Sequence, residues 1–198
     1  YMNDIINHYD LLIDEKNDPV RDPQVLRDYM DKWDGQIFIN SLQLNKNKNV
    51  LEIGVGTGRL AIKVIPNCKH FTGIDFSPKT IERAIENLER FDNKTLICGD
   101  FFDYCSTKKF DIIYSSLVLW HIKEKQAFID KVASLLSKNG RFVLSIADNQ
   151  SEELDFAIRK IHMYPDTIED TVNFLKKSNL KVTSINRVEF GTVFTAEK

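Results

Sequence analysis

Short apolar runs alternate with stretches of helical periodicity along most of this chain. Runs typical of buried strands occupy residues 50–53, 70–75, 95–98, 110–115 and 142–147. Between them, apolar residues recur every three or four positions, as on the buried face of a helix. They include Ile81, Ala84, Ile85, Leu88 and Phe91, and later Phe128, Ile129, Val132, Ala133 and Leu136. Strands that alternate with helices predict a parallel sheet with helices on both faces.

Both ends of the chain depart from this alternation. Asp22 and Pro23 are suited to the cap and first turn of a helix. Its predicted sheet-facing stripe is Val25, Tyr29, Met30, Trp33, Ile37 and Phe38. Later, Leu154, Ile158 and Ile161 indicate one helix, and residues 165–167 begin another that ends at Ser178 and Asn179. Segments 180–188 and 190–196 predict an antiparallel hairpin, which brings the strands to seven.

Three glycines at alternate positions follow the first predicted strand, in the stretch VLEIGVGTGRLA at residues 50–61. Glycine tolerates positive φ and lets a ligand approach the backbone, and the next helix directs free N–H groups to the same point. The dinucleotide pattern G-x-G-x-x-G does not fit, because Arg59 stands where its third glycine would be. The spacing therefore disfavours a dehydrogenase but still predicts an anionic or strongly polar ligand.

An acidic residue follows each of the next two predicted strands. Asp75 lies 21 residues after Gly54, a spacing that places its carboxylate beside the ligand, where it can accept hydrogen bonds from both ribose hydroxyls. Ser77 and Pro78 already supply the cap and first turn of the following helix. Asp100 can accept from the amine of an adenine and Phe101 can cover the ring, but a turn aspartate and a core phenylalanine explain that pair equally well.

Composition narrows the class of protein. The 198 residues suit one domain, and 42% hydrophobic with 28% charged residues is typical of a soluble globular protein. A net charge of −2 disfavours a nucleic-acid partner. No apolar run is long enough to span a membrane and no secretory signal is evident, so we expect a cytoplasmic protein. Cys68, Cys98 and Cys105 are expected to be buried and reduced, and the scattered histidines predict no metal site.

The stretch Glu52-x-Gly54-x-Gly56-x-Gly58 resembles motif I of the class I S-adenosylmethionine (SAM) dependent methyltransferases. The resemblance extends from about residue 45 to the C-terminus and includes SSLVLWHI at 115–122 and LLSKNGRFVLSIAD at 135–148. It implies an α/β fold with a three-layer, doubly wound, seven-stranded sheet, mostly parallel with the last strand antiparallel. It also implies a single methyltransferase domain over 1–198, with a helical cap at 1–44 and a SAM-binding core at 45–198.

The same resemblance assigns cofactor-binding residues by position. The glycine loop with Glu52 would hold the methionine end of SAM, and Ser116 would line the methionine and acceptor side. Asp75 would hold the ribose with Phe76 near the adenine, and Asp100 with Phe101 would face the adenine.

The acceptor is predicted to be a small molecule. Ser115-Ser116-Leu117-Val118 replaces the Asn/Asp-Pro-Pro-aromatic tetrad of DNA and protein amino methyltransferases, and the region between the fifth strand and the last hairpin is short. His121 is the first candidate for a catalytic base because imidazole titrates near neutrality, although its position after Trp120 at the start of a helix favours capping or packing. Asp148, Tyr9 and His162 are weaker candidates. Tyr9 and Tyr29 are also candidate lids over the site, whereas Trp33 is expected to pack in the core.

Other functions stay open from the sequence. They are an aminopropyl transferase of the same fold, a methyltransferase acting on a macromolecule, and a non-catalytic module that binds SAM or a nucleotide. The extra acidic residues and N-terminal β-domain typical of aminopropyl transferases are not evident. The oligomeric state and the acceptor atom are not indicated.

Overall fold

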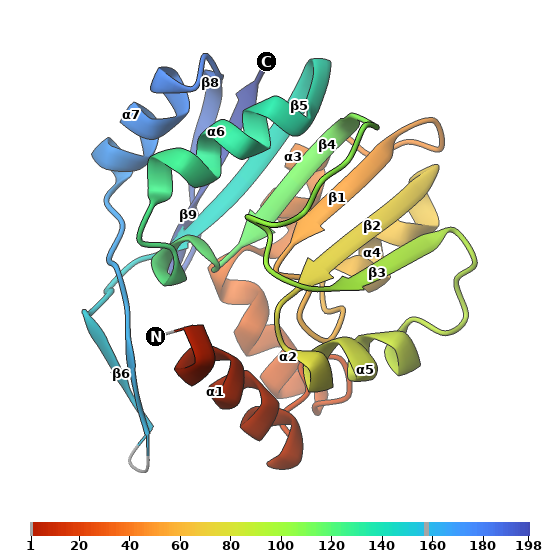
Figure 1. The fold of residues 1–198 in the computed structure, drawn as a ribbon, viewed down its shortest axis with the longest axis vertical. Helices are drawn as coiled ribbons and strands as arrows, with labels where there is room; N and C mark the ends of the chain where they lie inside the picture. The colour runs from red at the N-terminus through yellow and green to blue at the C-terminus, as the bar shows by residue number, and fades with distance from the viewer. Residues whose placement is uncertain (1, 157–158) are drawn as a thin grey trace.

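A computed structural model describes residues 2–156 and 159–198 of the chain. Its main sheet has seven strands in the order β3-β2-β1-β4-β5-β9-β8 (Figure 1). They are β1 (Asn49–Ile53), β2 (His70–Asp75), β3 (Lys94–Cys98), β4 (Phe110–Ser116), β5 (Leu136–Ala147), β8 (Lys181–Arg187) and β9 (Gly191–Glu197). The first five run parallel, and β9 pairs antiparallel with both β5 and β8. The predicted fold class and the terminal hairpin are confirmed.

Helices cover both faces of this sheet, because successive side chains of a strand point to opposite sides. One layer contains α6 (Lys125–Leu135) and α7 (Ile168–Lys177), whose buried residues pack on Leu51 and Ile53. The other contains α3 (Gly35–Leu42), α4 (Ala61–Val64) with η2 (Ile65–Asn67), and α5 (Pro78–Asn87), which pack on Val50 and Tyr114. The result is three layers with two separate apolar cores.

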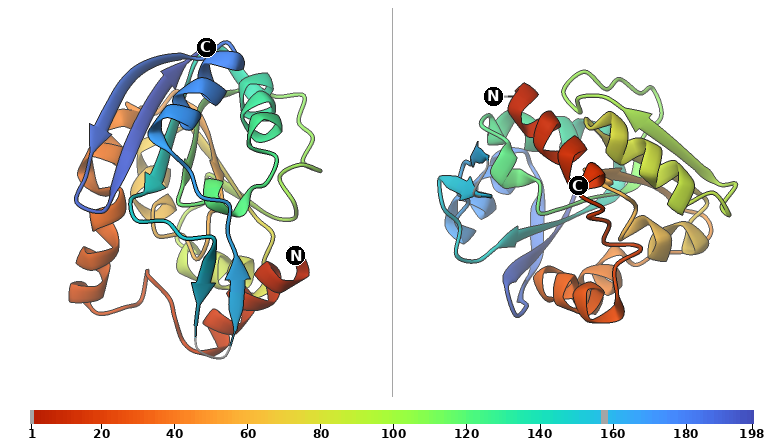
Figure 2. Two further views of the ribbon diagram at one scale, coloured as in Figure 1. Left: turned by 90° about the vertical axis from the view of Figure 1, so that its left-hand side faces the viewer. Right: turned by 90° about the horizontal axis from the view of Figure 1, so that it is seen from below.

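A cap lies at the carboxyl ends of the parallel strands. It consists of α1 (Met2–Asp14) and a two-stranded antiparallel ribbon of β6 (Glu153–Asp155) and β7 (Lys160–His162). Figures 1 and 2 show α1 below the ends of β1 and β2, with the ribbon beside it. A third apolar cluster joins the cap to the sheet: Ile5, Ile161 and Met163, with Tyr9, Phe76, Trp120 and Leu154 packed against them.

Two helices predicted in the C-terminal half differ from the structure. The expected helix around residues 154–161 is the β6–β7 ribbon, where Leu154 pairs directly with Ile161, so their shared face results from strand pairing. Ile158, expected on that helix, lies outside the described residues. Helix α6 ends at Leu135, so Leu136, predicted on its buried face, is not helical: it turns extended and pairs with Phe110 of β4. Asn139, at φ 61°, therefore lies within β5.

The N-terminal helical stripe is also corrected. The segment forms α2 (Gln24–Met30), η1 (Asp31–Trp33) and α3, and the cap position of α2 is Pro23, with no side-chain hydrogen bond from Asp22. Gly35, at φ 61°, interrupts the helical path, so Phe38 is buried whereas Val25 is 79% exposed. Elsewhere, Ile85 is exposed on α5, and Cys98 and Cys105 are exposed, so only Cys68 fits the expected burial.

The capping residues predicted for the later helices are confirmed. Ser77 caps α5 by accepting from the Thr80 amide at 3.2 Å, with Pro78 in the first turn. The Ser77 hydroxyl also donates to Asp10 Oδ1 of α1 at 2.7 Å. Helix α7 follows Thr167, which accepts from the Asp170 amide, and ends at Ser178. A single serine therefore both starts α5 and attaches the cap.

Ser77→Ala should lower the free energy of unfolding by about 1–2 kcal/mol, because the α5 cap and the bond to α1 are lost together. Urea denaturation measures the change. The matched control is Ser134→Ala at an exposed position, whose effect should stay within about 0.5 kcal/mol. Equal effects of the two substitutions would contradict the assigned role of Ser77.

Candidate functional site

The glycine loop lies at the point where the strand order reverses. Strand β1 is flanked by β2 and β4, and in open α/β sheets the crevice outside the carboxyl ends at such a point binds ligands. The amides of Gly54 and Val55 donate to the Ile74 carbonyl at 2.8 and 3.1 Å, which fixes the loop to β2. Gly54, Gly56 and Gly58 have φ values of 78°, 55° and 100°, so the loop conformation itself requires glycine.

The three glycines differ in what surrounds them. A Cβ at Gly54 would lie 2.3 Å from Val118 Cγ2, and one at Gly58 would lie 3.1 Å from Leu88. A Cβ at Gly56 would meet no atom within 4 Å. Gly54 and Gly58 therefore permit close packing within the protein, whereas Gly56 borders open space at the tip of the loop.

Asp75 joins the glycine loop to the ends of β2 and β3. Its Oδ2 accepts from the Gly56 amide at 3.0 Å, and its Oδ1 accepts from the Ser77 amide at 3.1 Å. Burial raises the pKa of this carboxyl group, and the backbone hydrogen bonds partly oppose that effect. The Gly99 amide donates to the Asp75 carbonyl at 2.8 Å. The three strand tips expected to share one ligand are therefore direct neighbours.

Asp100 and Phe101 have structural contacts at the tip of β3. Asp100 Oδ1 accepts from the Phe102 amide at 2.8 Å, as in a turn. Phe101 is 6% exposed, and its ring centroid lies 5.2 Å from that of Phe128 in the core. These are the turn and core roles weighed in the sequence, and contact of either residue with an adenine stays a prediction.

Glu52 is buried in the sheet beneath the glycine loop. It is 3% exposed and accepts a hydrogen bond of 2.7 Å from the Tyr114 hydroxyl. Burial raises the pKa of the Glu52 carboxyl group well above its usual range. In this position Glu52 supports β1, and its predicted contact with a cofactor is not tested.

Asp34 is a central residue that the sequence analysis missed. It is fully buried and accepts from the Gly35 amide at 2.7 Å, from Arg59 Nη1 at 3.0 Å and from the Ser116 hydroxyl at 2.6 Å. Ser116 also lies 2.8 Å from the Ser145 hydroxyl. The one signal in the sequence was the Asp-Gly pair that interrupts the helical stripe. Ser116 is thus held by protein groups, and its contact with a cofactor stays a prediction.

The segment after β4 meets the cap through Tyr9 and His121. It turns at Leu117, with φ 58°, and forms η3 (Leu119–His121). The Tyr9 hydroxyl lies 2.8 Å from His121 Nε2, and the Tyr9 ring lies 5.9 Å from that of Phe76. Burial raises the pKa of Tyr9, with a further contribution from Asp75, and burial lowers the pKa of His121 to about 3. Both side chains are therefore neutral near pH 7.

The other candidates lie in different surroundings. Tyr29 is 48% exposed, and Trp33 packs on Phe190 at a centroid distance of 5.0 Å. Asp148 forms an ion pair of 2.9 Å with Arg187, and His162 on β7 stacks edge-on with Tyr164 at 4.7 Å. Of the candidates for lid or base, the structure brings Tyr9 and His121 into contact with each other.

Known proteins resemble this chain in sequence and in fold. A family model described as a methyltransferase domain matches residues 44–188. The chain belongs to the class I SAM-dependent methyltransferase family. It is 31% identical over 131 residues to malonyl-[acyl-carrier protein] O-methyltransferase 1 of Ilyobacter polytropus, a match that covers 65% of this chain and 47% of that protein. An uncharacterized methyltransferase of Anoxybacillus flavithermus is 34% identical over 149 residues, 72% of this chain and 69% of that protein.

A solved structure of a methyltransferase shares the fold of this chain. The N-methyltransferase NodS from Bradyrhizobium japonicum, in complex with S-adenosyl-L-homocysteine, superposes with a TM-score of 0.65 at 20% identity and covers 82% of this chain and 86% of that chain. SAM is the cofactor of the family. The match to the first curated relative spans about half of that protein's length.

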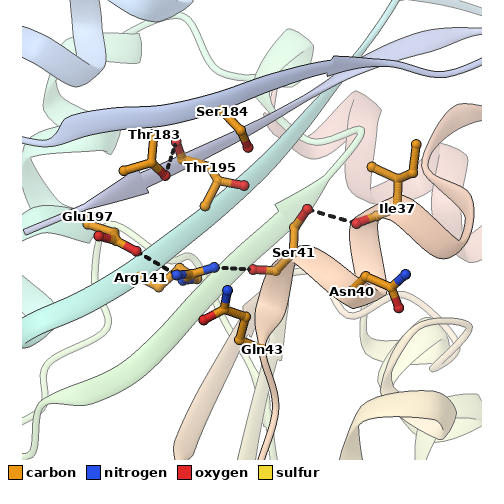
Figure 3. A pocket seen from close by; sticks show the side chains of 9 residues that line it. All are labelled: Ile37, Asn40, Ser41, Gln43, Arg141, Thr183, Ser184, Thr195 and Glu197. Atoms are coloured by element: carbon orange, nitrogen blue, oxygen red, sulfur yellow. Dashed lines mark hydrogen bonds and ion pairs between the residues drawn. The ribbon is translucent and has the colours of Figure 1, made fainter.

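A separate cleft of about 570 Å³ opens elsewhere on this methyltransferase domain (Figure 3). It lies between the end of α3 and the β8–β9 hairpin, where Arg141 pairs with Glu197 and donates to the Ser41 carbonyl at 2.9 Å. The residues lining this cleft include none of the glycine loop, Asp75 or His121. Among residues 2–156 and 159–198, no cluster of His, Cys, Asp or Glu is suited to a metal ion, and no helix is long and apolar enough to cross a membrane.

Gly56→Ala should weaken binding of S-adenosylhomocysteine at least about tenfold, because its methyl group enters the open space where the ligand would lie. It should lower the free energy of unfolding by about 1–2 kcal/mol, which is the cost of a left-handed φ for alanine. Gly54→Ala should destabilise the fold by more than about 2 kcal/mol, because its methyl group overlaps Val118. Calorimetry and urea denaturation measure the two effects. Adding Val118→Ala should restore part of the stability of Gly54→Ala, and equal behaviour of the two glycine variants would contradict their distinct roles.

Proposed function

We propose that this domain transfers a methyl group from SAM to a small-molecule acceptor. The observation that carries the proposal is the Asp75 carboxylate, held between the glycine loop and the tip of β3. Each of its oxygens accepts one backbone N–H, from Gly56 or from Ser77. A carboxylate has about four lone-pair sites, so one on each oxygen is left for the two hydroxyls of a ribose.

The surroundings of Asp75 are suited to the rest of the cofactor. The open space at Gly56 admits a ligand close to the backbone, and Phe76 follows Asp75 with a partly buried ring. Asp100 keeps its second carboxylate oxygen for an adenine amine, since Oδ1 is bonded to the Phe102 amide. We assign the glycine loop to the methionine end, Asp75 to the ribose, and Asp100 with Phe76 to the adenine.

When bound, SAM supplies an electrophilic methyl group on its sulfonium, so the protein has mainly to position the acceptor. Holding two reactants in line can contribute about 7–11 kcal/mol to lowering the barrier. The cap offers apolar surroundings for this step, because Tyr9, Phe76 and Trp120 pack against its buried apolar residues. In this proposal the acceptor binds beside η3, where the cap meets the end of β4.

A small acceptor is supported by the dimensions of the cap. Between β5 and β8 the described chain adds only the β6–β7 ribbon and α7. The relative named malonyl-[acyl-carrier protein] O-methyltransferase points to an acceptor of the size of a short acyl group, whether free or attached to a carrier. A non-catalytic module of the same fold would bind the cofactor and show no turnover with any acceptor.

Asp75→Asn should reduce the affinity for S-adenosylhomocysteine by about tenfold or more, because hydrogen bonds to a charged acceptor contribute about 1.5–3 kcal/mol each. Isothermal calorimetry measures the change. Asp103→Asn is the matched control on the exposed turn after β3, and its affinity should equal that of the wild type. Binding of NAD in preference to SAM and S-adenosylhomocysteine would overturn the proposed cofactor.

A further inference from the structure

Two ring nitrogens of η3 are buried and lack a hydrogen-bond partner among the described residues. They are Nε1 of Trp120 and Nδ1 of His121, neighbours in sequence whose rings meet edge-on at 5.9 Å. Buried polar groups in native proteins are almost always paired, and an unpaired one costs free energy. Two such groups side by side at the end of β4 point to a ligand that completes them.

Both nitrogens are hydrogen-bond donors. The indole Nε1 of Trp120 always carries its proton. The Tyr9 hydroxyl lies 2.8 Å from His121 Nε2, and we assign the hydroxyl as the donor, because the opposite direction would leave the buried Tyr9 proton without an acceptor. A neutral imidazole has one N–H, which then stands on Nδ1. The site therefore offers two N–H groups and requires an oxygen or another acceptor atom from its ligand.

The surroundings define the rest of the ligand. The apolar cluster of the cap places Ile5, Ile161 and Met163 next to Trp120, which suits a hydrocarbon body. The Lys125 ammonium group disfavours a proton on His121, and its own charge is paired with the buried Asp166 carboxylate at 2.5 Å. Lys125 also donates to the Leu119 and Tyr164 carbonyls at 2.9 and 2.7 Å, so its donors are used within the protein.

We propose that the acceptor is an apolar carboxylic acid, one oxygen of which is held by Trp120 Nε1 and His121 Nδ1 while the other takes the methyl group. This inference rests on the proposed methyltransferase function. In the step, the carboxylate oxygen forms the new O–CH₃ bond as the S–CH₃ bond breaks. The products are a methyl ester and the neutral thioether S-adenosylhomocysteine, and no proton is transferred.

The state of the Tyr9–His121 pair agrees with this chemistry. The lone pair of His121 is already used by Tyr9, and burial keeps Tyr9 protonated. A carboxylate is nucleophilic as it arrives at neutral pH, whereas an alcohol or a protonated amine would need somewhere to send a proton. His121 is thereby reassigned from the predicted base to a hydrogen-bond donor that contacts the acceptor.

Nuclear magnetic resonance tests the contact directly, because the chain has two tryptophans and therefore two indole N–H signals. The signal that disappears in Trp33→Phe belongs to Trp33, which assigns the other to Trp120. In the wild type, the signal of Trp33, which packs on Phe190, serves as the internal reference. With S-adenosylhomocysteine bound, adding hexanoate or benzoate should shift the Trp120 signal downfield and leave the Trp33 signal in place. A full shift on S-adenosylhomocysteine alone would assign the two donors to the cofactor's own carboxylate and overturn the proposal.

Activity on matched acceptors provides the second test. Short-chain alkyl and aryl carboxylates should be methylated in preference to the corresponding amides, alcohols and amines. Trp120→Phe should lower kcat/KM for the carboxylate about tenfold, as expected when one hydrogen bond to a charged group is lost, with unchanged affinity for S-adenosylhomocysteine. Trp33→Phe is the matched control and should behave as wild type.

The outcomes separate this inference from the proposed function. If S-adenosylhomocysteine does not bind, the proposed function fails. If S-adenosylhomocysteine binds but amines or alcohols are methylated in preference, the proposed function stands and the carboxylate assignment is overturned. If no carboxylate is bound or methylated, the carboxylate assignment is also overturned, and without turnover of any acceptor the function reduces to cofactor binding. An unchanged kcat/KM in Trp120→Phe would also overturn it.

The pH profile gives an independent readout. The charged and titratable groups around His121 are Tyr9, His8 and Lys125. Lys125 is paired with Asp166 at 2.5 Å, Asp75 acts on Tyr9, and Arg159 donates to His8 at 2.8 Å. His8 has its pKa lowered to about 4 by burial and by Arg159. Neither His8 nor His121 changes charge between about pH 6 and pH 8, so carboxylate methylation should be nearly constant there. A rate that rises through about pH 6.5 would identify a histidine base and contradict the proposal.

Discussion

The hydrogen bond from the Gly56 amide to the Asp75 carboxylate is the contact on which the site depends. It joins the tip of the loop after β1 to the end of β2, at 3.0 Å. Because Asp75 also accepts from the Ser77 amide, each oxygen of its carboxylate is fixed by a backbone N–H. The carboxyl edge of a parallel sheet brings these groups together because every strand of the unit ends on the same side.

A buried charge network holds this edge from the side of α3. Asp34 is fully buried and is compensated by Arg59, which directly follows the glycine loop, and by the Ser116 hydroxyl after β4. A buried carboxylate is tolerated only when it is paired and hydrogen-bonded, so the network specifies the relative positions of these three segments. The loop, the β4 turn and the start of α3 are thus coupled, and the site is a property of all three.

The cap determines what chemistry is possible above the sheet. Tyr9 and His121 hold each other neutral in a buried environment, so the pair positions groups and does not exchange protons near pH 7. The ring nitrogens Nε1 of Trp120 and Nδ1 of His121 are buried at the apolar cap without a partner among the described residues. In such surroundings an anionic acceptor would lose water and gain two hydrogen bonds, which is a direct way to orient it.

By itself the sequence determined the parallel core, the glycine loop, the acid at the end of β2, the cap of α5 and the terminal hairpin. Each of these depends on neighbouring residues, on alternation along a strand or on the φ values that glycine allows. Only the tertiary structure decided the burial of Asp34, the Tyr9–His121 contact, the β6–β7 ribbon and the early end of α6. Ser116 meets Asp34 across 82 positions and Tyr9 meets His121 across 112, and local patterns contain no information on contacts formed at such separations.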